Sequence, residues 1–354
     1  MLGEAPRRPR DMRSGATELS GAATAMKKLK FLVSLSTSDN DFQAEQAKAA
    51  EELARRLGAF VQVIYAENDA INQSQQLLAV IQSSGDHPDG IIVQPVGGSG
   101  LPHVARAAVS AGIAWAVLNR EADYIHDLRR TSLVPVFGVS SNHIEIGRIQ
   151  GRQLGALAPA GGTVIYIQGP ATTAAARDRT RGVEQTKPAN VKLINFKGNW
   201  TEQSAYKAMC SWMQLSTSKG TSIDIVMAQN DDMAMGARKA FQEHAHPDVK
   251  QRWLSLPFAG CDGSPKTGQA FVRSGLLAAT VVIPPNTNVA MEMVVEGLRT
   301  GKQPKDLVLT TPTSLPTIEE LASRAARSAN LARPGLAALE PTPEKNPRFP
   351  NSRE

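Results

Sequence analysis

Residues 31–65 read FLVSLSTSDNDFQAEQAKAAEELARRLGAFVQVIY, and this stretch decides the fold class. Two apolar runs, Phe31–Leu35 and Phe60–Tyr65, enclose a segment of helical periodicity, Asp41–Leu57, which ends at Gly58. A short apolar run is typical of a parallel strand covered on both faces, and Gly commonly ends a helix. The stretch therefore predicts a strand–helix–strand unit of an α/β protein.

The same unit recurs along most of the chain. Further strands are expected at Ile91–Val93, Ile113–Leu118, Val134–Val139, Val164–Ile167, Val191–Phe196, Ile223–Met227, Leu254–Ala259 and Ala278–Ile283. Further helices are expected at Asn72–Ser83, Leu101–Ala111, Asn142–Leu157, Ala174–Thr186, Thr201–Leu215, Asp231–Glu243, Pro265–Ser274 and Asn286–Thr300. So many strands exceed one ordinary sheet, and the sequence predicts an α/β fold with two doubly wound parallel-sheet lobes. Residues 325–354 lack periodicity and are expected to form a disordered tail.

Composition and charge exclude several classes of protein. The chain has 354 residues, of which 42% are hydrophobic and 20% charged, so it can form a core. Its two cysteines, Cys210 and Cys261, are too few for a disulfide scaffold or a zinc module. The net charge of +6 comes from the two tails, and the near-neutral body argues against a nucleic-acid partner. Residues 1–27 are expected to be a disordered basic extension.

The N-terminal region shows no recognisable export signal. The apolar run after Lys27 and Lys28 is only Phe31–Leu35, and Ser34 interrupts it. A signal peptide needs about 7–15 apolar residues, and a membrane-spanning helix needs about 18. A cytoplasmic location therefore stays open at this point.

Side chains suited to a polar ligand follow several of the expected strands. In open α/β sheets, ligands bind beyond the carboxyl ends of the strands. The side chains there are amides, guanidinium groups, a carboxylate and two aromatic rings, which together suit a hydroxyl-rich ligand such as a sugar. They are Asn40, Phe42, Gln94, Asn119, Arg120, Arg177, Trp200, Asn230 and Asp262.

Many of these strand-end positions also suit a structural role. Trp200 is equally suited to packing, and Arg120 and Arg177 to surface ion pairs. Asn or Asp just past a strand often caps the following helix. The residues placed for capping are Asp41, Asn72, Asn142, Asp231 and Asn286.

Motifs for catalysis and cofactor binding are absent from the sequence. No G-x-G-x-x-G follows a strand, and there is neither a phosphate loop nor a G-x-S-x-G nucleophile elbow. The run Gly97–Gly100 is Gly-rich but lacks the lysine of a phosphate loop, and His244 and His246 alone do not make a metal site. We therefore expect no catalytic residue, no metal and no cofactor, and a binding function instead of an enzyme.

Four motifs occur in a fixed order in the second half of the body. They are Ala174–Arg179 with Gly182, Gln229–Ala237, Gly260–Pro265 and Leu277–Val281. On these residues the chain, from about Lys28 to about Ile318, resembles the type I periplasmic sugar-binding proteins, and the ribose-binding group in particular. The resemblance implies two lobes joined by three hinge crossings. It implies an N-terminal lobe of residues 28–138 plus 284–306, a C-terminal lobe of residues 139–283 plus 307–320, and crossings near Phe137–Ser140, Ile283–Pro285 and Lys305–Val308.

The resemblance also implies a ligand, a mechanism and partners. The family's ligand contacts, carried over by position, fall on Asn40, Phe42, Asn119, Arg120, Arg177, Trp200, Asn230 and Asp262. The implied function is capture of a sugar or sugar-like polyol by hinge closure in the periplasm, and its delivery by a monomer to the permease of an ABC transporter. Three departures argue against ribose itself: Gln43 replaces an aromatic residue, Asn119 replaces an aspartate, and Ile283 and Pro284 replace a late glutamine.

Three other functions are compatible with the same fold. A cytosolic sensor would bind a sugar or sugar phosphate and present its closed form to a signalling partner such as a kinase, and the missing export signal favours it. A repressor-type regulatory domain needs an N-terminal helix-turn-helix, for which residues 1–25 are too short and irregular. An enzyme would need a nucleophile–base pair or a metal cluster in the cleft.

Overall fold

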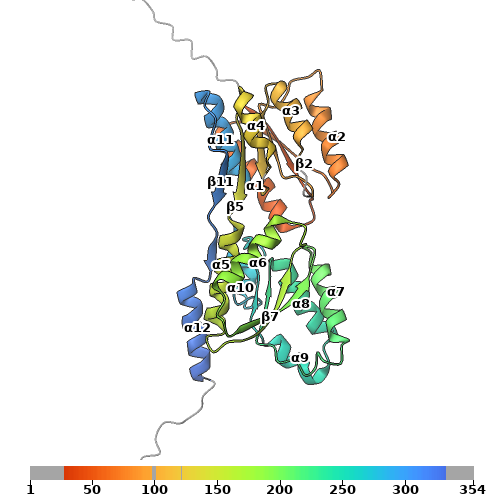
Figure 1. Ribbon diagram of the computed structural model, residues 1–354, viewed down its shortest axis with the longest axis vertical. Coiled ribbons are helices and arrows are strands. Elements are labelled where there is room, and N and C mark those ends of the chain that lie inside the picture. The colour runs from red at the N-terminus through yellow and green to blue at the C-terminus, as the bar shows by residue number, and fades with distance from the viewer. Residues whose placement is uncertain (1–27, 98–100, 121, 332–354) are drawn as a thin grey trace, which may run out of the picture.

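Six parallel strands form the sheet of the N-terminal lobe. The computed structural model describes residues 28–97, 101–120 and 122–331, and Figure 1 shows two α/β lobes stacked along its long axis. The strand order is β11-β5-β4-β3-β1-β2, and every neighbouring pair is parallel. The strands are β1 (Lys30–Leu35), β2 (Phe60–Tyr65), β3 (Gly90–Val93), β4 (Ala114–Leu118), β5 (Val136–Ser141) and β11 (Leu307–Thr310).

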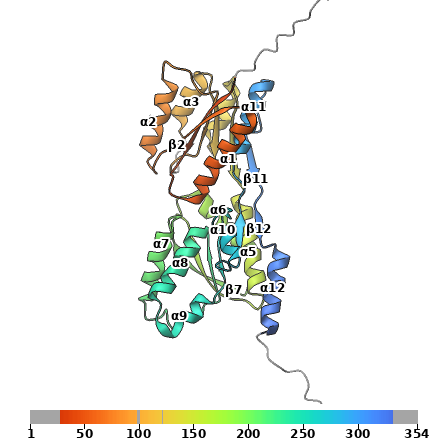
Figure 2. The same cartoon turned by 180° about the vertical axis from the view of Figure 1, so that it is seen from behind.

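Helices cover both faces of this sheet, as Figures 1 and 2 show from opposite sides. The helices of this lobe are α1 (Asp41–Leu57), α2 (Ala70–Ile81), α3 (Pro102–Ser110), α4 (Tyr124–Thr131) and α11 (Thr287–Thr300). Phe31, Val33 and Leu35 of β1 are buried on the face of α1 and α11. Leu32 is buried on the opposite face with α2 and α3. This two-sided burial explains why the β1 run is almost entirely apolar.

Short polar side chains cap several of the helices. The capping residues are Asn40 for α1, Asp69 for α2, Asn142 for α5 (His143–Leu157) and Asn230 for α8 (Asp231–His244). The predicted cap at Asn142 is confirmed. Those at Asp41, Asn72 and Asp231 are wrong, because the capping residue lies earlier in the chain in each case. Asn286 stands at the N-cap position of α11, but its side chain makes no capping hydrogen bond.

Four parallel strands form the main sheet of the C-terminal lobe, in the order β7-β6-β8-β9. Parallel bridges from Ala259 to Ala279 and from Asp262 to Val282 continue the sheet toward β10, which pairs antiparallel with β12. The strands are β6 (Gly162–Gln168), β7 (Val191–Lys197), β8 (Ile225–Ala228), β9 (Phe258–Ala259), β10 (Thr280–Val282) and β12 (Thr313–Leu315). The remaining helices are α6 (Ala174–Thr186), α7 (Glu202–Met213), α9 (Pro247–Leu254), α10 (Gly268–Arg273) and α12 (Ile318–Leu331).

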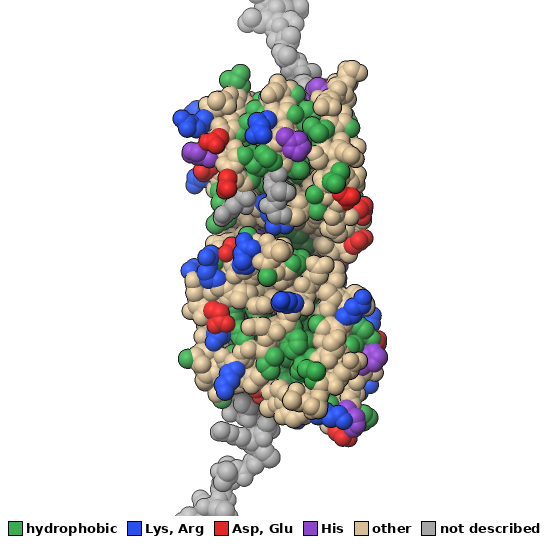
Figure 3. All heavy atoms as spheres, turned by 45° about the vertical axis from the view of Figure 1, so that its right-hand side comes forward, with side chains coloured by type: hydrophobic (Ala, Val, Ile, Leu, Met, Phe, Trp, Pro, Cys, Tyr) green, Lys and Arg blue, Asp and Glu red, His purple; other side chains and the backbone are tan. Residues whose placement is uncertain are grey.

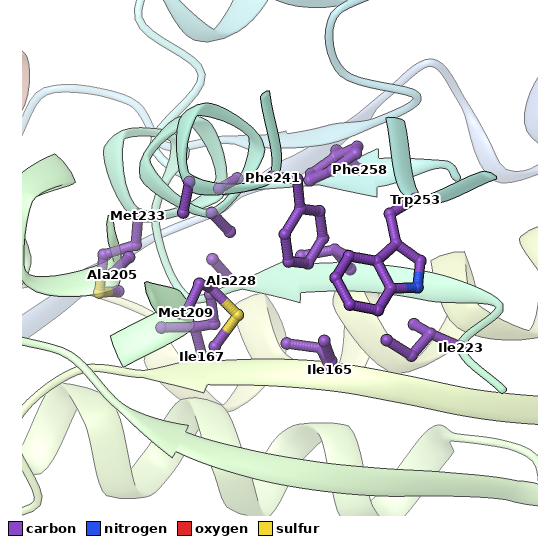
Figure 4. Packing of buried hydrophobic residues seen from close by; sticks show 14 of the residues in the cluster. Ile165, Ile167, Ala205, Met209, Ile223, Ala228, Met233, Phe241, Trp253 and Phe258 are labelled. Carbon is purple, nitrogen blue, oxygen red and sulfur yellow. The ribbon is translucent and has the colours of Figure 1, made fainter. Parts of the chain in front are cut away.

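An aromatic cluster fills one face of the C-terminal sheet (Figure 4). The ring centroid of Phe241 lies 5.1 Å from that of Trp253 and 6.1 Å from that of Phe258. Ile165 and Ile167 of β6 line the sheet side of the same cluster. Large buried rings dominate the energetics of a core, so this cluster anchors α8 and α9 to the sheet whose strand ends carry the polar residues.

The chain crosses between the lobes three times. The first crossing follows Ser141, because β5 runs to that residue within the N-terminal sheet. The second lies between β10 and α11. The third lies between β11 and β12, because Leu307–Thr310 pairs with β5. Residues 139–141 and 307–310 are thus part of the N-terminal sheet, contrary to the lobe boundaries and the third crossing expected from the sequence.

Several elements differ from the sequence expectation. The Arg-rich stretch after β4, to which no helix or strand was assigned from the sequence, contains α4. The strand expected at Leu254–Ala259 is reduced to β9, because α9 extends to Leu254. Residues 325–331, expected to be disordered, continue α12, whose Leu321 is buried in the core. The expected disordered segments 1–27 and 332–354 lie outside the described residues. Within the described ranges, every helix is too short or too polar to span a bilayer.

Candidate ligand-binding cleft

A cleft of about 490 Å³ lies between the two lobes, and Figure 3 shows the molecular surface hollowed at this level. Loops that follow β1, β3 and β4 line it from the N-terminal lobe, and loops that follow β6, β7 and β8 line it from the C-terminal lobe. The volume lies within the range of small-molecule sites. Eight of the nine residues predicted from the strand ends line it: Asn40, Phe42, Gln94, Asn119, Arg120, Trp200, Asn230 and Asp262.

The ninth predicted residue, Arg177, does not line the cleft. Its side chain is exposed and donates to the carbonyl of Ala171 at 3.0 Å. Arg179 lines the cleft instead and is 5% exposed. Positions two apart on a helix point to nearly opposite sides, so the choice of Arg177 was wrong in helical phase. The burial of Ala176 and Val183, at i−3 and i+4 from Arg179, was the signal that marks the inner face of α6.

Arg179 is held by three groups of the C-terminal lobe. Its Nη1 donates to the carbonyl of Gln229 and lies 3.6 Å from Asp262 Oδ1. Its guanidinium carbon lies 5.3 Å from the ring centroid of Trp200, a cation–π distance. The backbone of α6 approaches α5 closely here, since a Cβ on Gly147 would lie 2.0 Å from the Arg179 carbonyl oxygen. Close helix packing therefore fixes the base of this side chain.

Trp200 forms an aromatic wall whose position is fixed by its surroundings. Its backbone has a left-handed φ of 63°, and its carbonyl accepts from Asn230 Nδ2 at 2.9 Å. Its six-membered ring lies over Gly169, where any Cβ would come within 2.2 Å of it. Asn230 Oδ1 accepts from the backbone N–H of Met233 at 3.0 Å, so both ends of this amide are used by the protein. Asn230 therefore acts on the cleft chiefly by placing Trp200.

Asp262 lies beside Arg179 in the same wall. Its backbone has a φ of 101°, which few residues other than glycine adopt, and its N–H donates to the Val281 carbonyl. Burial raises the pKa of Asp262 to about 7, although the guanidinium of Arg179 opposes the rise, and Asp232 and Asp41 contribute to it. A carboxyl group with a pKa near 7 can both donate to and accept from a ligand hydroxyl.

Asp231 supports this wall from behind, although the sequence suggested a helix cap. Its Oδ1 accepts from Thr280 Oγ1 at 2.7 Å and its Oδ2 accepts from the N–H of Gly263 at 2.8 Å. A Cβ on Gly260 would lie 2.2 Å from Oδ1, so glycine is needed there. The motifs Gln229–Ala237 and Gly260–Pro265 therefore interlock, and Asp231 fixes the loop that presents Asp262.

Asn119 is the centre of an amide network in the N-terminal lobe. Its Oδ1 accepts from Asn286 Nδ2 at 2.6 Å and from the N–H and hydroxyl of Ser141, each at 3.2 Å. Its Nδ2 donates to Gln94 Oε1 at 3.2 Å. Asn286 Oδ1 accepts from Thr310 Oγ1 at 2.8 Å. Ser141, Asn286 and Thr310 stand next to the three crossings, so this network ties the hinge segments together.

Arg120 follows Asn119 and faces the cleft. Burial, and next the positive charge of Arg177, lower the pKa of Arg120. Within the described ranges Arg120 forms no ion pair, so the surface ion pair considered from the sequence is not seen there.

Two polar residues of the cleft were not assigned to ligand binding by the sequence analysis. His143 begins α5 at the first crossing, and neither of its ring nitrogens has a hydrogen-bond partner among the described residues. Burial, together with the positive charges of Arg179 and Arg120, lowers the pKa of His143 to about 3. Gln43 is 3% exposed, and its Oε1 also lacks a partner in the described part of the chain. No local pattern marks His143, because the groups around it come from distant segments.

Comparison with known proteins identifies the family of this fold and cleft. Residues 31–303 match the model of a family described as periplasmic binding protein domain. This chain belongs to that family. The resemblance inferred from the sequence motifs is thereby confirmed for the family and for the two-lobed α/β fold class.

Curated relatives of this periplasmic-binding-protein chain are about 28% identical to it. A putative rhizopine-binding protein of Rhizobium meliloti matches at 28% identity over 59% of this chain and 66% of its own length. The ribose import binding protein of Escherichia coli K12 matches at 28% over 73% of this chain and 81% of its own length.

Solved structures share the fold. The myo-inositol binding protein of Caulobacter superposes with a TM-score of 0.67 at 23% identity, covering 84% of this chain and 97% of that one. A solute binding protein of Actinobacillus succinogenes with bound D-allose has a TM-score of 0.70 at 19% identity, covering 84% of this chain and all of that one. Identities at this level show the fold alone.

Proposed function

We propose that this protein captures a sugar or sugar-like polyol in the interlobe cleft and delivers it to the permease of an ABC importer. The observation that carries the proposal is the convergence of both lobes on one cleft. The C-terminal lobe supplies an aromatic ring beside an arginine and a carboxyl group, and the N-terminal lobe supplies amides and a second arginine. Sugars need such a set, since their hydroxyls donate and accept while their C–H faces pack on rings.

The mechanism is closure of the two lobes around the ligand. A ligand that contacts Trp200 and Asp262 on one wall and Arg120 on the other makes all its contacts only when the walls approach. It therefore binds the closed form better and shifts the population toward it. The three crossings, tied by the Asn119 network, are the segments about which the lobes rotate.

The names of the relatives support an importer over a sensor. The Escherichia coli relative is named as a ribose import binding protein, and another, from Mycolicibacterium smegmatis, as a xylitol-binding protein. A periplasmic location, a monomeric state and an ABC permease as partner are parts of this proposal. The proposal contains no catalytic step.

Binding to the full chain is tested by calorimetry and thermal unfolding with D-ribose, xylitol, myo-inositol, D-allose and their acidic and phosphorylated counterparts. A ligand at 100 times its dissociation constant adds about 2.7 kcal/mol to the free energy of unfolding. We expect at least one compound to bind and to lower the radius of gyration measured by small-angle X-ray scattering. Binding by none of them contradicts the proposed function, and binding without compaction contradicts hinge closure.

Trp200 provides an internal reporter for the same titration. The other three tryptophans are Trp115, Trp212 and Trp253, and all are buried in the cores. The ligand should therefore change the fluorescence of Trp200 alone. The Trp200→Phe variant keeps an aromatic wall and should lose the fluorescence change while retaining binding by calorimetry. A fluorescence change that persists in this variant places the ligand elsewhere.

A further inference from the structure

The cleft contains buried donors that find no acceptor among the described residues. Arg179 Nε is buried and unpartnered, although its Nη1 is bonded to the Gln229 carbonyl. Both ring nitrogens of His143 are likewise buried and unpartnered. A buried polar group left unsatisfied costs about 1–3 kcal/mol, so such groups normally have a partner. A ligand group that reaches Arg179 Nε and the N–H of the His143 ring must therefore offer acceptor atoms.

The charges of the cleft wall do not balance. The guanidinium groups of Arg120 and Arg179 line the inner part of the cleft together with one carboxyl group, that of Asp262. Asp39 also lines the cleft, but on its exposed rim. Asn119 stands next to Arg120 and contributes no charge. The inner wall is therefore positive by about one charge when Asp262 is ionised, and by more when it is protonated.

Other nearby charges do not restore the balance. Arg177 adds a further positive charge that acts on Arg120. Asp123 and Asp306 line a smaller pocket that Arg120 also lines, but neither forms an ion pair with it in the described structure. Asp231 is held by Thr280 and Gly263 behind the wall. Asp41 and Asp232 act on Asp262 electrostatically, but neither lines the cleft. The positive excess is thus a property of the residues that line the inner cleft.

His143 joins the two arginines as a neutral group. Arg120 and Arg179 both act on its ring, and it begins α5, where a positive side chain is disfavoured by the helix dipole. A neutral imidazole offers one donor and one acceptor. The hinge side of the cleft therefore combines two cations with a neutral donor that has no hydrogen-bond partner in the described part of the chain.

We propose that the ligand carries an anionic group, a carboxylate or a phosphate, which binds to Arg120, Arg179 Nε and His143 on the hinge side of the cleft. This inference rests on the proposed function and narrows it from neutral sugars to sugar acids or sugar phosphates. Trp200 and Asp262 remain for the sugar ring, and Gln43 Oε1 remains as an acceptor for a hydroxyl. An anionic oxygen accepts only, and its bonds to arginine are about twice as strong as neutral ones.

The decisive experiment compares matched neutral and anionic ligands on the full chain by isothermal titration calorimetry. The pairs are D-glucose with D-glucuronate, D-galactose with D-galacturonate, D-ribose with D-ribose 5-phosphate, and myo-inositol with myo-inositol 1-phosphate. In at least one pair we expect the anionic member to bind about tenfold or more tightly. A preference for a uronate identifies a carboxylate ligand, and a preference for a phosphate ester identifies a phosphorylated one, and either supports the inference.

Two variants test whether the preference arises at the proposed residues. Arg120→Gln should weaken binding of the anionic ligand at least about tenfold and that of its neutral partner by much less. Asn119→Asp keeps the Oδ1 acceptor for Ser141 and Asn286 but adds a negative charge, so it should reduce or reverse the preference. Arg177→Gln removes a neighbouring charge outside the cleft and is the matched control, with an expected change below about threefold. Thermal unfolding of each variant verifies that it is folded.

The outcomes separate this inference from the proposed function. If neutral members bind as well as or better than anionic ones in every pair, the inference is overturned and the proposed function stands. If Arg177→Gln abolishes the preference as strongly as Arg120→Gln, the assigned residues are wrong and the inference falls. If no member of any pair binds, the proposed function fails and the inference fails with it.

Discussion

The two walls of the cleft are organised differently. In the C-terminal wall, Arg179 contacts both Asp262 and Trp200, and each of the three is also held by a hydrogen bond to another group of the lobe. In the N-terminal wall, Asn119 is bound into the hinge network, while Arg120 has no partner among the described residues. One wall is thus formed before any ligand arrives, whereas the other carries a charge whose proposed partner is the ligand. Substitutions should therefore separate stability from binding according to the wall they affect.

Arg179→Ala should have the largest effect, because Arg179 holds the C-terminal wall together and is also a proposed ligand contact. Its loss leaves the Gln229 carbonyl and the Asp262 carboxyl group buried without their donor. Removing one partner of a buried charge pair costs about 3–5 kcal/mol of unfolding free energy. We expect a loss of this size in urea denaturation and at least a hundredfold weaker binding of the best ligand in the panel.

Arg179→Lys tests how much of this stability loss comes from the shape of the guanidinium group. Lysine keeps the positive charge but loses the planar fork that reaches the Gln229 carbonyl and stacks on Trp200. Its stability should fall between those of the unsubstituted protein and Arg179→Ala. Full stability in Arg179→Ala would show that the C-terminal wall is not preformed.

Arg120→Ala should affect binding alone. We expect ligand affinity to fall about 10- to 100-fold, while the free energy of unfolding changes by less than about 0.5 kcal/mol, because no bond within the described residues is lost. Calorimetry measures the ligand affinity and denaturation measures the free energy of unfolding, both on the same preparation. A stability loss comparable to that of Arg179→Ala would remove the distinction between the walls.

More of the fold than of the site could be predicted from the sequence. Unbroken apolar runs such as Ile91–Val93 follow directly from burial on two faces, so most of the parallel strands could be predicted. No strand was expected at 307–310, and these residues were placed in the wrong lobe. Leu309 of the edge strand β11 is 49% exposed, and the partner strand β5 is far away in sequence. α12 was not predicted from the sequence, because its Ala- and Arg-rich sequence resembles a solvated tail.

The cleft residues likewise divide into those that could be predicted from the sequence and those that could not. Those that follow a strand could be predicted, because the topology brings all such positions to one edge. Arg179 required the phase of α6 to within two residues, which a helix boundary read from sequence does not provide. His143 could be identified only by knowing that Arg120 and Arg179 act on its ring, and these two residues lie on other segments of the chain. Groups whose chemistry depends on contacts between segments are therefore the ones that need the structure.

The hinge network offers a prediction of intermediate size. Asn286 is fully buried, donates to Asn119 and Ser141, and accepts from Thr310. Asn286→Ala removes these bonds and should lower the free energy of unfolding by about 2 kcal/mol. Asn286→Asp should cost more above about pH 5, because its carboxylate would face Asn119 Oδ1, which is itself an acceptor. Equal costs for the two variants in denaturation at pH 7 would contradict the assigned direction of the bond.

The smallest effect concerns Asp41 and Asp232, two carboxyl groups on different lobes that repel each other. Burial, then Asp41 at the start of α1, then Glu202, raise the pKa of Asp232 at the start of α8 to about 6. A carboxyl group whose pKa is higher in the folded state binds protons more readily there, so its favourable contribution is lost as the pH rises through 6. Asp232→Asn does not titrate and should gain about 1–2 kcal/mol of unfolding free energy relative to the unsubstituted protein between pH 4 and pH 8.

Asp41→Asn decides whether that gain comes from a contact between the lobes. Asp41 belongs to the N-terminal lobe and Asp232 to the C-terminal lobe, so their repulsion depends on how closely the lobes approach. Removing the Asp41 charge should lower the pKa of Asp232, measured by NMR titration, while leaving the larger contribution of burial. Because closure brings the two helix starts together, the ligand should raise this pKa further in the unsubstituted protein and not in Asp41→Asn. If the ligand changes the Asp232 pKa equally in the unsubstituted protein and in Asp41→Asn, lobe closure does not bring Asp41 toward Asp232.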